Sequence, residues 1–268
     1  MVYSKKISIG FQKKRILMSK IITTNLHQKL LKIIEEIEFN FPLDYSVETN
    51  KLFVKLQSTL IPFSTLPIET VQRLQVIWGY RGYSMEKHFS MQGDYTRFDF
   101  YPKYKKLLLF DTLSLRKVID KKKYHKVIFI GSGCLPLSLK LLRLNIQKVG
   151  YDISTEALNL AKKAIPKDRF GRKIIYKEGN FFDLNLNEKR PIIIYVAGLI
   201  RDKEEGLKRL AKELPKGSLM VIRTVANDER RFLYEKIDKK KLYRLGSVRE
   251  FIPTKNSKVV NGMIVIKV

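Results

Sequence analysis

The sequence of 268 residues contains one cysteine, Cys134, and three histidines. A single cysteine excludes a disulfide within the chain and any zinc site built on several cysteines, and it is typical of proteins kept in a reducing compartment. The histidines, His27, His88 and His125, show no metal-ligand spacing. We therefore predict a cytoplasmic protein with no metal site and no catalytic thiol.

Long apolar runs are also missing. No uninterrupted stretch approaches the roughly 20 residues that a membrane helix requires, and the basic amino terminus adjoins no apolar segment long enough for a signal peptide. Residues 1–17 show no strong periodicity, so we expect disorder there. The sequence predicts no membrane partner.

Acidic residues are scarce relative to basic ones, because 26 Asp and Glu oppose 53 Lys and Arg and give a formal charge of +27. Such an excess attracts phosphates, anionic lipids or acidic small molecules, and charge alone does not select among them. The lysine runs at 121–123 and 239–241 fit a solvated surface equally well. The hydrophobic content of 44% is enough for a folded core.

The first 125 residues are predicted to be mainly helical. Apolar residues recur at helical spacing over 25–38, where Asn25 can cap the helix, and 68–78 and 103–118 show similar patterns. We assign residues 1–123 to an N-terminal helical domain.

The pattern changes at residue 127, where strands begin to alternate with helices. Strands are predicted at 127–130, 148–152, 173–177, 191–196, 218–223 and 262–267, and helices at 135–146, 154–165, 203–213 and 228–236. This alternation implies parallel βαβ units, with strands buried between helical layers. We predict an α/β fold, with a Rossmann-like domain over residues 124–268 behind the helical domain.

A glycine turn follows the first predicted strand, in the segment VIFIGSGCLPLS at 127–138. Gly131 and Gly133 have no Cβ, so the chain can turn sharply and its backbone can approach a ligand closely. Ser132 and Leu135 are expected to line the same cradle. Because the third glycine of the dinucleotide motif is absent, a purely structural turn remains an alternative.

An acidic residue, Asp152, ends the next predicted strand about 20 residues after the glycine turn. Rossmann folds place an acid there to bind ribose hydroxyls. Asp152 and Ser154 also precede a predicted helix, so capping that helix is the alternative role. The register with the glycine turn favours ribose binding.

The segment GNFFDL at 179–184 follows the third predicted strand. Asn180 or Asp183 can hydrogen-bond the edge of an adenine, and Phe181 or Phe182 can cover the ring. Core packing of the two phenylalanines is the alternative.

Arginines near the end of the fifth predicted strand are candidates for binding a substrate carboxylate. Arg223 ends that strand, and a guanidinium binds a carboxylate bidentately. Arg230 and Arg231 can add to this site. Each arginine can instead form a surface ion pair.

Several of these segments together resemble the nicotianamine synthase-like enzymes of plants, archaea and bacteria, in particular the archaeal and bacterial type. The likeness extends over roughly residues 98–236. Its segments are FDFYPKY at 98–104, FIGSGCLPLS at 129–138, YDIS at 151–154, VAGLI at 196–200 and PKGSLMVIRTVANDERRFLY at 215–234. Their common order makes the resemblance more specific than a glycine turn alone.

The resemblance implies a SAM-binding Rossmann-like domain, SAM being S-adenosylmethionine, and transfer of its 3-amino-3-carboxypropyl group to a small amine or amino acid. Methylthioadenosine would leave, and the product would be a nicotianamine-like metallophore. SAM is then a substrate, and no metal takes part. The residues expected to bind SAM are Gly131, Ser132, Gly133, Leu135, Asp152, Asn180, Asp183 and Ala197.

The resemblance also implies two catalytic residues on the acceptor side. In the family, a Glu before the FYPxY segment and the last Tyr of that segment line the acceptor site. Tyr104 matches this tyrosine, and Glu86 is the nearest candidate for the glutamate, at a shorter spacing than in the family. Attack by an amine requires a group that takes its proton, which a carboxylate or a tyrosine can do.

The sequence is also compatible with two other functions. The charge of +27 favours an RNA-directed SAM enzyme that transfers either a methyl or an aminocarboxypropyl group. A protein that binds SAM without chemistry is the third possibility. A homodimer is compatible with all three.

Overall fold

The computed structural model describes residues 25–59, 66–119, 123–225, 237–254, 259 and 261–268. Its contacts divide the chain into two compact units, residues 1–81 and 82–268. The division falls within helix α3 (Ile68–Gln92). The predicted boundary at 123/124 separates helices from strands, whereas the contacts assign α4 (Tyr101–Leu115) to the second unit.

The first unit is helical in the part that the structure describes. It contains a helix over residues 25–39, α2 (Val47–Thr59) and the first part of α3. The apolar pattern did not predict α2, whose start depends on polar contacts: the Ser46 hydroxyl accepts the Thr49 N–H at 3.2 Å. The buried core of the first unit includes Leu30, Ile33, Ile34, Ile37, Leu43, Phe53, Leu56, Leu74 and Ile77.

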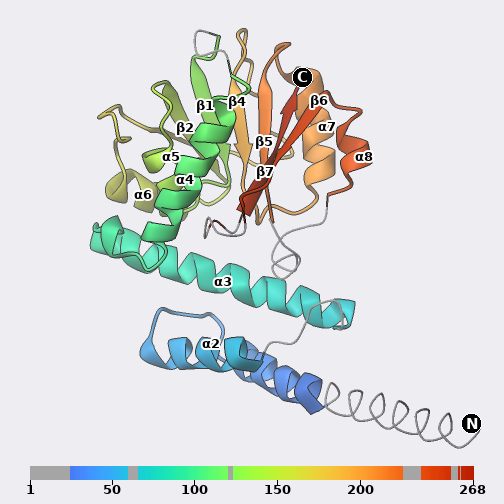
Figure 1. The fold of residues 1–268 in the computed structure, drawn as a ribbon. Helices are drawn as coiled ribbons and strands as arrows, with labels where there is room; N and C mark the ends of the chain where they lie inside the picture. Colours follow the sequence, from blue (N-terminus) through green and yellow to red (C-terminus); the bar gives the residue numbers. More distant parts are fainter. Residues whose placement is uncertain (1–24, 60–65, 120–122, 226–236, 255–258, 260) are drawn as a thin grey trace, which may run out of the picture. The chain divides into compact units, whose positions relative to one another are not determined.

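The second unit is built on a seven-stranded sheet with the order β3-β2-β1-β4-β5-β7-β6 (Figure 1). The strands are β1 (Lys126–Ile130), β2 (Gln147–Asp152), β3 (Ile175–Glu178), β4 (Ile193–Val196), β5 (Leu219–Val225), β6 (Ser247–Phe251) and β7 (Asn261–Lys267). Strands β1 to β5 are parallel, as predicted. The strand order reverses between β1 and β4, which is where this class of sheet forms its ligand crevice.

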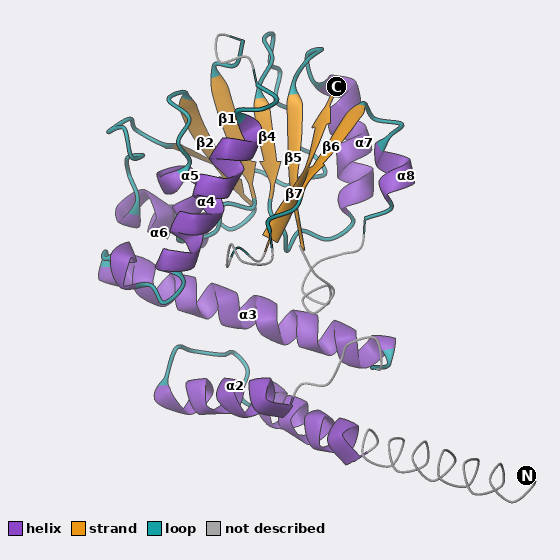
Figure 2. Ribbon diagram, in the orientation of Figure 1, coloured by secondary structure: helices purple, strands orange, loops and turns teal. Residues whose placement is uncertain are grey.

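Helices cover both faces of this sheet (Figure 2). They are α4, α5 (Leu137–Leu141), α6 (Thr155–Ala164), α7 (Lys203–Glu213) and α8 (Lys239–Leu242). Ile128 and Ile130 of β1 belong to a buried cluster that includes Leu207 of α7 and Leu242 of α8. After Lys126 the strand is apolar, because residues 127–130, which alternate between its two faces, are all buried. The predicted α/β Rossmann-like fold with N-terminal helices is confirmed.

Helix α5 is shorter than the predicted helix over 135–146. The Lys148 ammonium donates to the Leu142 carbonyl at 2.9 Å, and the Arg143 N–H donates to the Thr112 hydroxyl at 3.2 Å. These contacts satisfy the backbone at the helix end from outside the helix, so the chain leaves the helix after Leu141.

The sheet is mixed, because β7 pairs antiparallel with both β5 and β6. The prediction of parallel βαβ units therefore holds for β1 to β5 and is wrong for β7, and the sequence patterns did not predict β6. Consecutive strands joined without a crossover helix lie antiparallel, as β6 and β7 do.

The predicted helix at 228–236 lies outside the described residues. None of the helices in the described part of the chain has the length and apolar character needed to cross a bilayer.

Candidate active site

The glycine turn lies at the carboxyl end of β1. Gly131 and Gly133 have φ angles of +73° and +68°, in the left-handed region that glycine adopts without strain. The N–H groups of Gly131 and Ser132 both donate to the Tyr151 carbonyl, at 2.8 and 2.9 Å. A Cβ on Gly131 would lie 3.0 Å from the Cβ of Ala197, so Ala197 covers the turn. These contacts place four of the predicted SAM-binding residues near one another.

Asp152 holds the glycine turn against the start of α6. One carboxylate oxygen accepts the Gly133 N–H at 2.8 Å, and the other accepts the Ser154 N–H at 3.0 Å. Ser154 itself caps α6 by accepting the Ala157 N–H at 3.1 Å. Asp152 thus fixes two backbone segments, and each oxygen retains a lone pair for a ribose hydroxyl. Ribose binding stays a prediction.

Glu86, on the last turns of α3, lies against the same glycine turn. Its carboxylate accepts a hydrogen bond from the Leu135 N–H. A Cβ on Gly133 would lie 2.7 Å from the Glu86 Oε2, so only glycine leaves room for this carboxylate. Burial and the negative charge of Asp152 raise the pKa of Glu86 to about 8. The structure therefore brings a predicted catalytic carboxylate to the predicted SAM cradle.

One face of α3 holds Glu86 in this position. The Tyr83 hydroxyl donates to Glu156 Oε2 at 2.8 Å, and the Lys87 ammonium lies 2.7 Å from Glu156 Oε1. Further along, the Ser90 hydroxyl donates to the Cys134 carbonyl at 2.6 Å. The sequence reasoning missed these residues, although their spacing of three to four residues is that of one helix face.

The Cys134 side chain is buried, and the charges of Glu86 and Asp152 act on its thiol. It is completely buried, and this burial raises the pKa of its thiol to about 12. A thiol that does not ionise near neutral pH is a poor nucleophile. Cys134 therefore serves through its backbone carbonyl and its packing.

The loop after β3 is shaped by its own polar groups. The Asn180 side-chain oxygen accepts the Phe182 N–H at 3.1 Å. Arg209 of α7 donates to the Phe181 carbonyl at 2.9 Å. Phe181 lies in the hydrophobic core, and Phe182 is exposed. Of the two phenylalanines, only Phe182 is free to cover a ring, and the adenine contacts of Asn180 and Asp183 stay predictions.

Tyr104 lies in the first turn of α4 and is partly exposed. Its ring lies 6.2 Å from that of Phe98, which in turn lies 5.5 Å from the ring of Phe89 on α3. Phe89 is three residues after Glu86. This row of rings connects Tyr104 to the helix segment that carries Glu86, and a catalytic role for Tyr104 stays a prediction.

Arg223 lies on β5 in a buried ion pair with α4. Its Nη2 is 2.9 Å from Asp111 Oδ2, and it donates to the Ser138 hydroxyl at 3.3 Å. The guanidinium also lies over the rings of Phe129 and Tyr195, 5.9 Å from each centroid. Burial raises the pKa of Asp111, and Arg223 opposes this shift. Arg223 thus has a clear structural role, and carboxylate binding would add to it. Arg230 and Arg231 lie outside the described residues.

Among the described residues, metal-ligating side chains do not gather at this site. Within the described ranges, no group of three or more His, Cys, Asp or Glu side chains is placed to hold a metal ion. Glu86 and Asp152 lie beside the turn, and both accept backbone N–H groups. The site thus offers a backbone cradle, the Asp152 carboxylate that is predicted to bind ribose, and the Glu86 carboxylate with its raised pKa.

Comparison with known families gives a match over nearly the whole chain. The family model described as "Nicotianamine synthase protein" matches residues 18–268. Among curated proteins, "Nicotianamine synthase 3" of Arabidopsis thaliana is 28% identical over 273 residues, covering 90% of this chain and 83% of that protein. "Nicotianamine synthase 9" of Hordeum vulgare is 24% identical, covering 84% of this chain and 73% of that protein.

Solved structures give the same relationship at the level of the fold. The crystal structure of MtNAS in complex with MTA and tNA is 19% identical, with a TM-score of 0.65, and covers 90% of this chain and 97% of that chain. A glutamate-to-glutamine variant of MtNAS in complex with S-adenosylmethionine is 17% identical, with a TM-score of 0.63 and the same coverage. The similarity therefore includes the helical part as well as the sheet.

Proposed function

Because the chain belongs to the nicotianamine synthase family, we propose that it transfers the 3-amino-3-carboxypropyl group of SAM to a small amine or amino acid. Methylthioadenosine is the second product, and the modified amine is a nicotianamine-like metallophore. The observation that carries this proposal is the placement of Glu86. Its carboxylate lies against the glycine turn, beside Asp152, with its pKa raised to about 8.

The cradle fits the adenosyl part of SAM. Gly131, Ser132 and Gly133 offer backbone that a ligand can approach closely, and Asp152 offers lone pairs to the ribose hydroxyls. The Ser132 hydroxyl is buried and has no hydrogen-bond partner within the described part of the chain. Ala197 and the loop with Asn180 and Asp183 would line the adenine side.

Glu86 serves as the general base in this proposal. The amine nitrogen forms a bond to the γ-carbon next to sulfur, the carbon–sulfur bond breaks, and its electron pair stays on sulfur. The ammonium proton passes to the Glu86 carboxylate. A carboxylate with a raised pKa is a stronger base than an ordinary glutamate. With a pKa of about 8, Glu86 is still partly ionised near neutral pH, so the basic form is present. The positive sulfonium favours the ionised form further.

Tyr104 and Arg223 are proposed to act on the acceptor. Tyr104 would hydrogen-bond the amine or relay its proton, and Arg223 would bind its carboxylate. Holding the amine in line with the departing sulfur is the main task of these groups, since orientation alone lowers the barrier of a displacement substantially. The displacement itself uses no metal, because the sulfonium is already an activated leaving group.

A nucleic-acid substrate is disfavoured by the charges around the cradle. At the carboxyl ends of β1 to β4, the described residues 130–136, 152–156, 178–184 and 196–202 carry one cation, Arg201, and β5 adds Arg223 near its end. The same segments carry the acids Asp152, Glu156, Glu178, Asp183 and Asp202. An RNA acceptor requires a basic surface leading into the site. The local charges therefore favour a small acceptor.

The test is mass spectrometry of the purified protein incubated with SAM and a pool of amino acids. The proposal expects methylthioadenosine and an amine that is heavier by one or more aminocarboxypropyl units. Release of S-adenosylhomocysteine together with a methylated acceptor would contradict it. Omitting one amino acid at a time from the pool identifies the acceptor.

A further inference from the structure

The positive charge of the chain is distributed unevenly. Among the described residues of the first unit, Lys and Arg are equal in number to Asp and Glu. In the second unit, cations gather in the loops that lead into the amino ends of β3, β2, β1 and β4, at 165–174, 142–146, 123–125 and 185–192. We call these four loops the amino edge. Because β1 to β4 are parallel, this edge is opposite the glycine turn.

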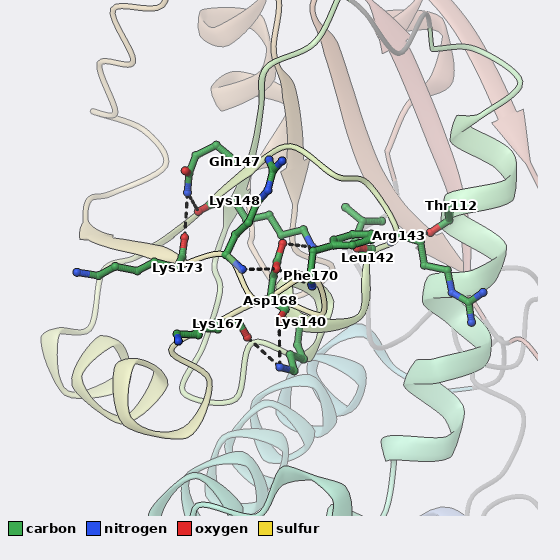
Figure 3. A network of polar contacts seen from close by, with 11 residues as sticks. Thr112, Lys140, Leu142, Arg143, Gln147, Lys148, Lys167, Asp168, Phe170 and Lys173 are labelled. Atoms are coloured by element: carbon green, nitrogen blue, oxygen red, sulfur yellow. Dashed lines mark hydrogen bonds and ion pairs between the residues drawn. The ribbon is translucent and has the colours of Figure 1, made fainter.

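The loop before β3 is held rigidly by a buried ion pair (Figure 3). Lys148 and Asp168 are almost fully buried, and their charged atoms lie 3.0 Å apart. The other Asp168 oxygen accepts the N–H groups of Phe170 and Arg172, at 2.8 and 3.0 Å. Gln147 donates to the Lys173 carbonyl at 3.1 Å. The loop is thus joined to β2 at two points, Asp168 and Lys173.

The loop before β3, held in this way, exposes cations and one aromatic ring to solvent. Lys167, Arg169, Arg172 and Lys173 are exposed, and in Figure 3 the side chains of Lys167 and Lys173 point away from the ion pair. Phe170 is 44% exposed, and the Arg169 guanidinium lies 5.7 Å from its ring centroid. A fixed aromatic ring between cations is the arrangement on which an unpaired base can stack.

The cationic surface continues along the amino edge to β4. Lys189 and Arg190 are exposed there, about 14 Å from the β3 loop if neighbouring strands are about 4.8 Å apart. The acids that the described residues place on this edge are already paired. Asp168 is bound to Lys148, and Glu188 contacts Lys126 and His125. The exposed charge of the edge is therefore positive.

We propose that the amino edge binds a single-stranded nucleic acid, whose phosphates contact Lys167, Arg169, Arg172, Lys173, Lys189 and Arg190 while a base stacks on Phe170. An anionic membrane fits less well. Phe170 is the one large apolar side chain that the described amino-edge loops expose, and stable membrane binding draws on a larger inserted apolar area. The partner binds away from the cradle, so it is not the acceptor of the transfer reaction.

The test is fluorescence anisotropy of a labelled oligouridylate about 12 nucleotides long, a length within the range that one such surface covers, titrated with the full chain at several KCl concentrations. Binding is expected to weaken as salt rises, with a log–log slope of about −0.7 for each phosphate contacted. The double substitution Arg169→Glu and Arg172→Glu is expected to weaken binding about tenfold or more and to make this slope shallower. Phe170→Ala is expected to weaken binding without changing the slope.

The matched control is Lys240→Glu with Arg249→Glu, which changes the net charge by the same amount on α8 and β6, away from the amino edge. Both double variants are compared by circular dichroism and by their transferase rates, which neither is expected to change. If the Arg169/Arg172 variant proves unfolded, Phe170→Ala and its salt slope decide the question.

Two results would overturn the proposal. The first is equal loss of oligouridylate binding in the amino-edge variant and in the control, because that would mean diffuse attraction by net charge. The second is tighter binding to phosphatidylserine vesicles than to the oligonucleotide, with the amino-edge substitutions abolishing it, because the partner would then be a membrane. These binding measurements do not depend on catalysis. If the chain showed no transferase activity, the comparison of the two double variants and the comparison of oligonucleotide with vesicles would still test the proposal.

Discussion

Glu86 has neighbours that act on its charge in opposite directions. The Leu135 N–H stabilises the carboxylate, while burial and Asp152 oppose ionisation and dominate, so the pKa rises to about 8. Such a residue is costly for the folded state at neutral pH, which fits the catalytic role that we propose for it.

We expect Glu86→Gln to lower the rate of group transfer by about 100-fold or more, because removing a general base typically has an effect of this size. SAM affinity should remain, since the cradle and Asp152 are unchanged. Single-turnover kinetics and equilibrium binding of SAM measure the two effects separately. Glu213→Gln, at an exposed ion pair on α7, is the control, and equal rates for the two variants would argue against the role of Glu86.

The raised pKa of Glu86 also predicts a pH dependence of stability. In the folded chain Glu86 keeps its proton up to about pH 8, whereas the unfolded chain loses it near 4.5. The wild type should therefore lose free energy of unfolding as pH rises from 4.5 to 8, by roughly 2–4 kcal/mol more than Glu86→Gln. Urea unfolding at several pH values measures this difference. Parallel pH profiles for both proteins would show that Glu86 is not perturbed.

Gly133 combines a left-handed backbone with close contact to Glu86. Gly133→Ala is expected to cost about 1–3 kcal/mol more than Gly93→Ala. Gly93 has a similar φ of +73°, but a Cβ there would meet no atom within 4 Å. Thermal unfolding measures both. In a Glu86→Ala background the excess cost of Gly133→Ala should shrink, and an unchanged cost would mean that the clash is elsewhere.

At the scale of elements, the ion pair between Asp111 and Arg223 joins α4 to β5. Arg223→Met would leave a buried carboxylate without its cation and is expected to cost about 3–5 kcal/mol. Adding Asp111→Leu should recover most of this stability. Chemical denaturation measures the recovery, and no recovery would mean that Arg223 stabilises the fold by other contacts.

The same pair of variants tests the proposed substrate role of Arg223. The stable double variant should show a raised KM for the acceptor with SAM affinity unchanged, because the carboxylate would lose its guanidinium. An unchanged KM would restrict Arg223 to its structural role.

Some elements were predictable because their local signals agree with their surroundings. Residues 127–130 followed by Gly131 predict a buried strand and a turn, and β1 and the left-handed Gly131 confirm both. The early end of α5 was not predictable, because contacts from Thr112 and Lys148 determine it. Thr112 is remote in sequence, and Lys148 lies on the next strand, so neither contact can be read from the helix segment itself.

In the site, too, local signals were predictable from the sequence and contacts between remote elements were not. The sequence identified Asp152 and Gly133 by their spacing, and a hydrogen bond joins them. The face of α3 that holds Glu86 was missed, because Tyr83 and Ser90 act through partners on other elements. Helical spacing shows which residues share a face, but not what that face contacts.

At the scale of the whole molecule, the two edges of the second unit differ in charge. Acids predominate among the described residues around the cradle, and cations predominate at the amino edge. The net charge of +27 therefore says little about the substrate. Fold, family and site geometry favour a small acceptor, while the charge favours a separate partner.

The most direct test of aminocarboxypropyl transfer follows two labels in SAM. One sample carries a carbon isotope label in the methyl group and the other carries it in the aminocarboxypropyl group, and each is incubated with the identified amine. We predict that the aminocarboxypropyl label enters the amine and that the methyl label leaves in methylthioadenosine. A methyl label in the amine, with release of S-adenosylhomocysteine, would contradict it.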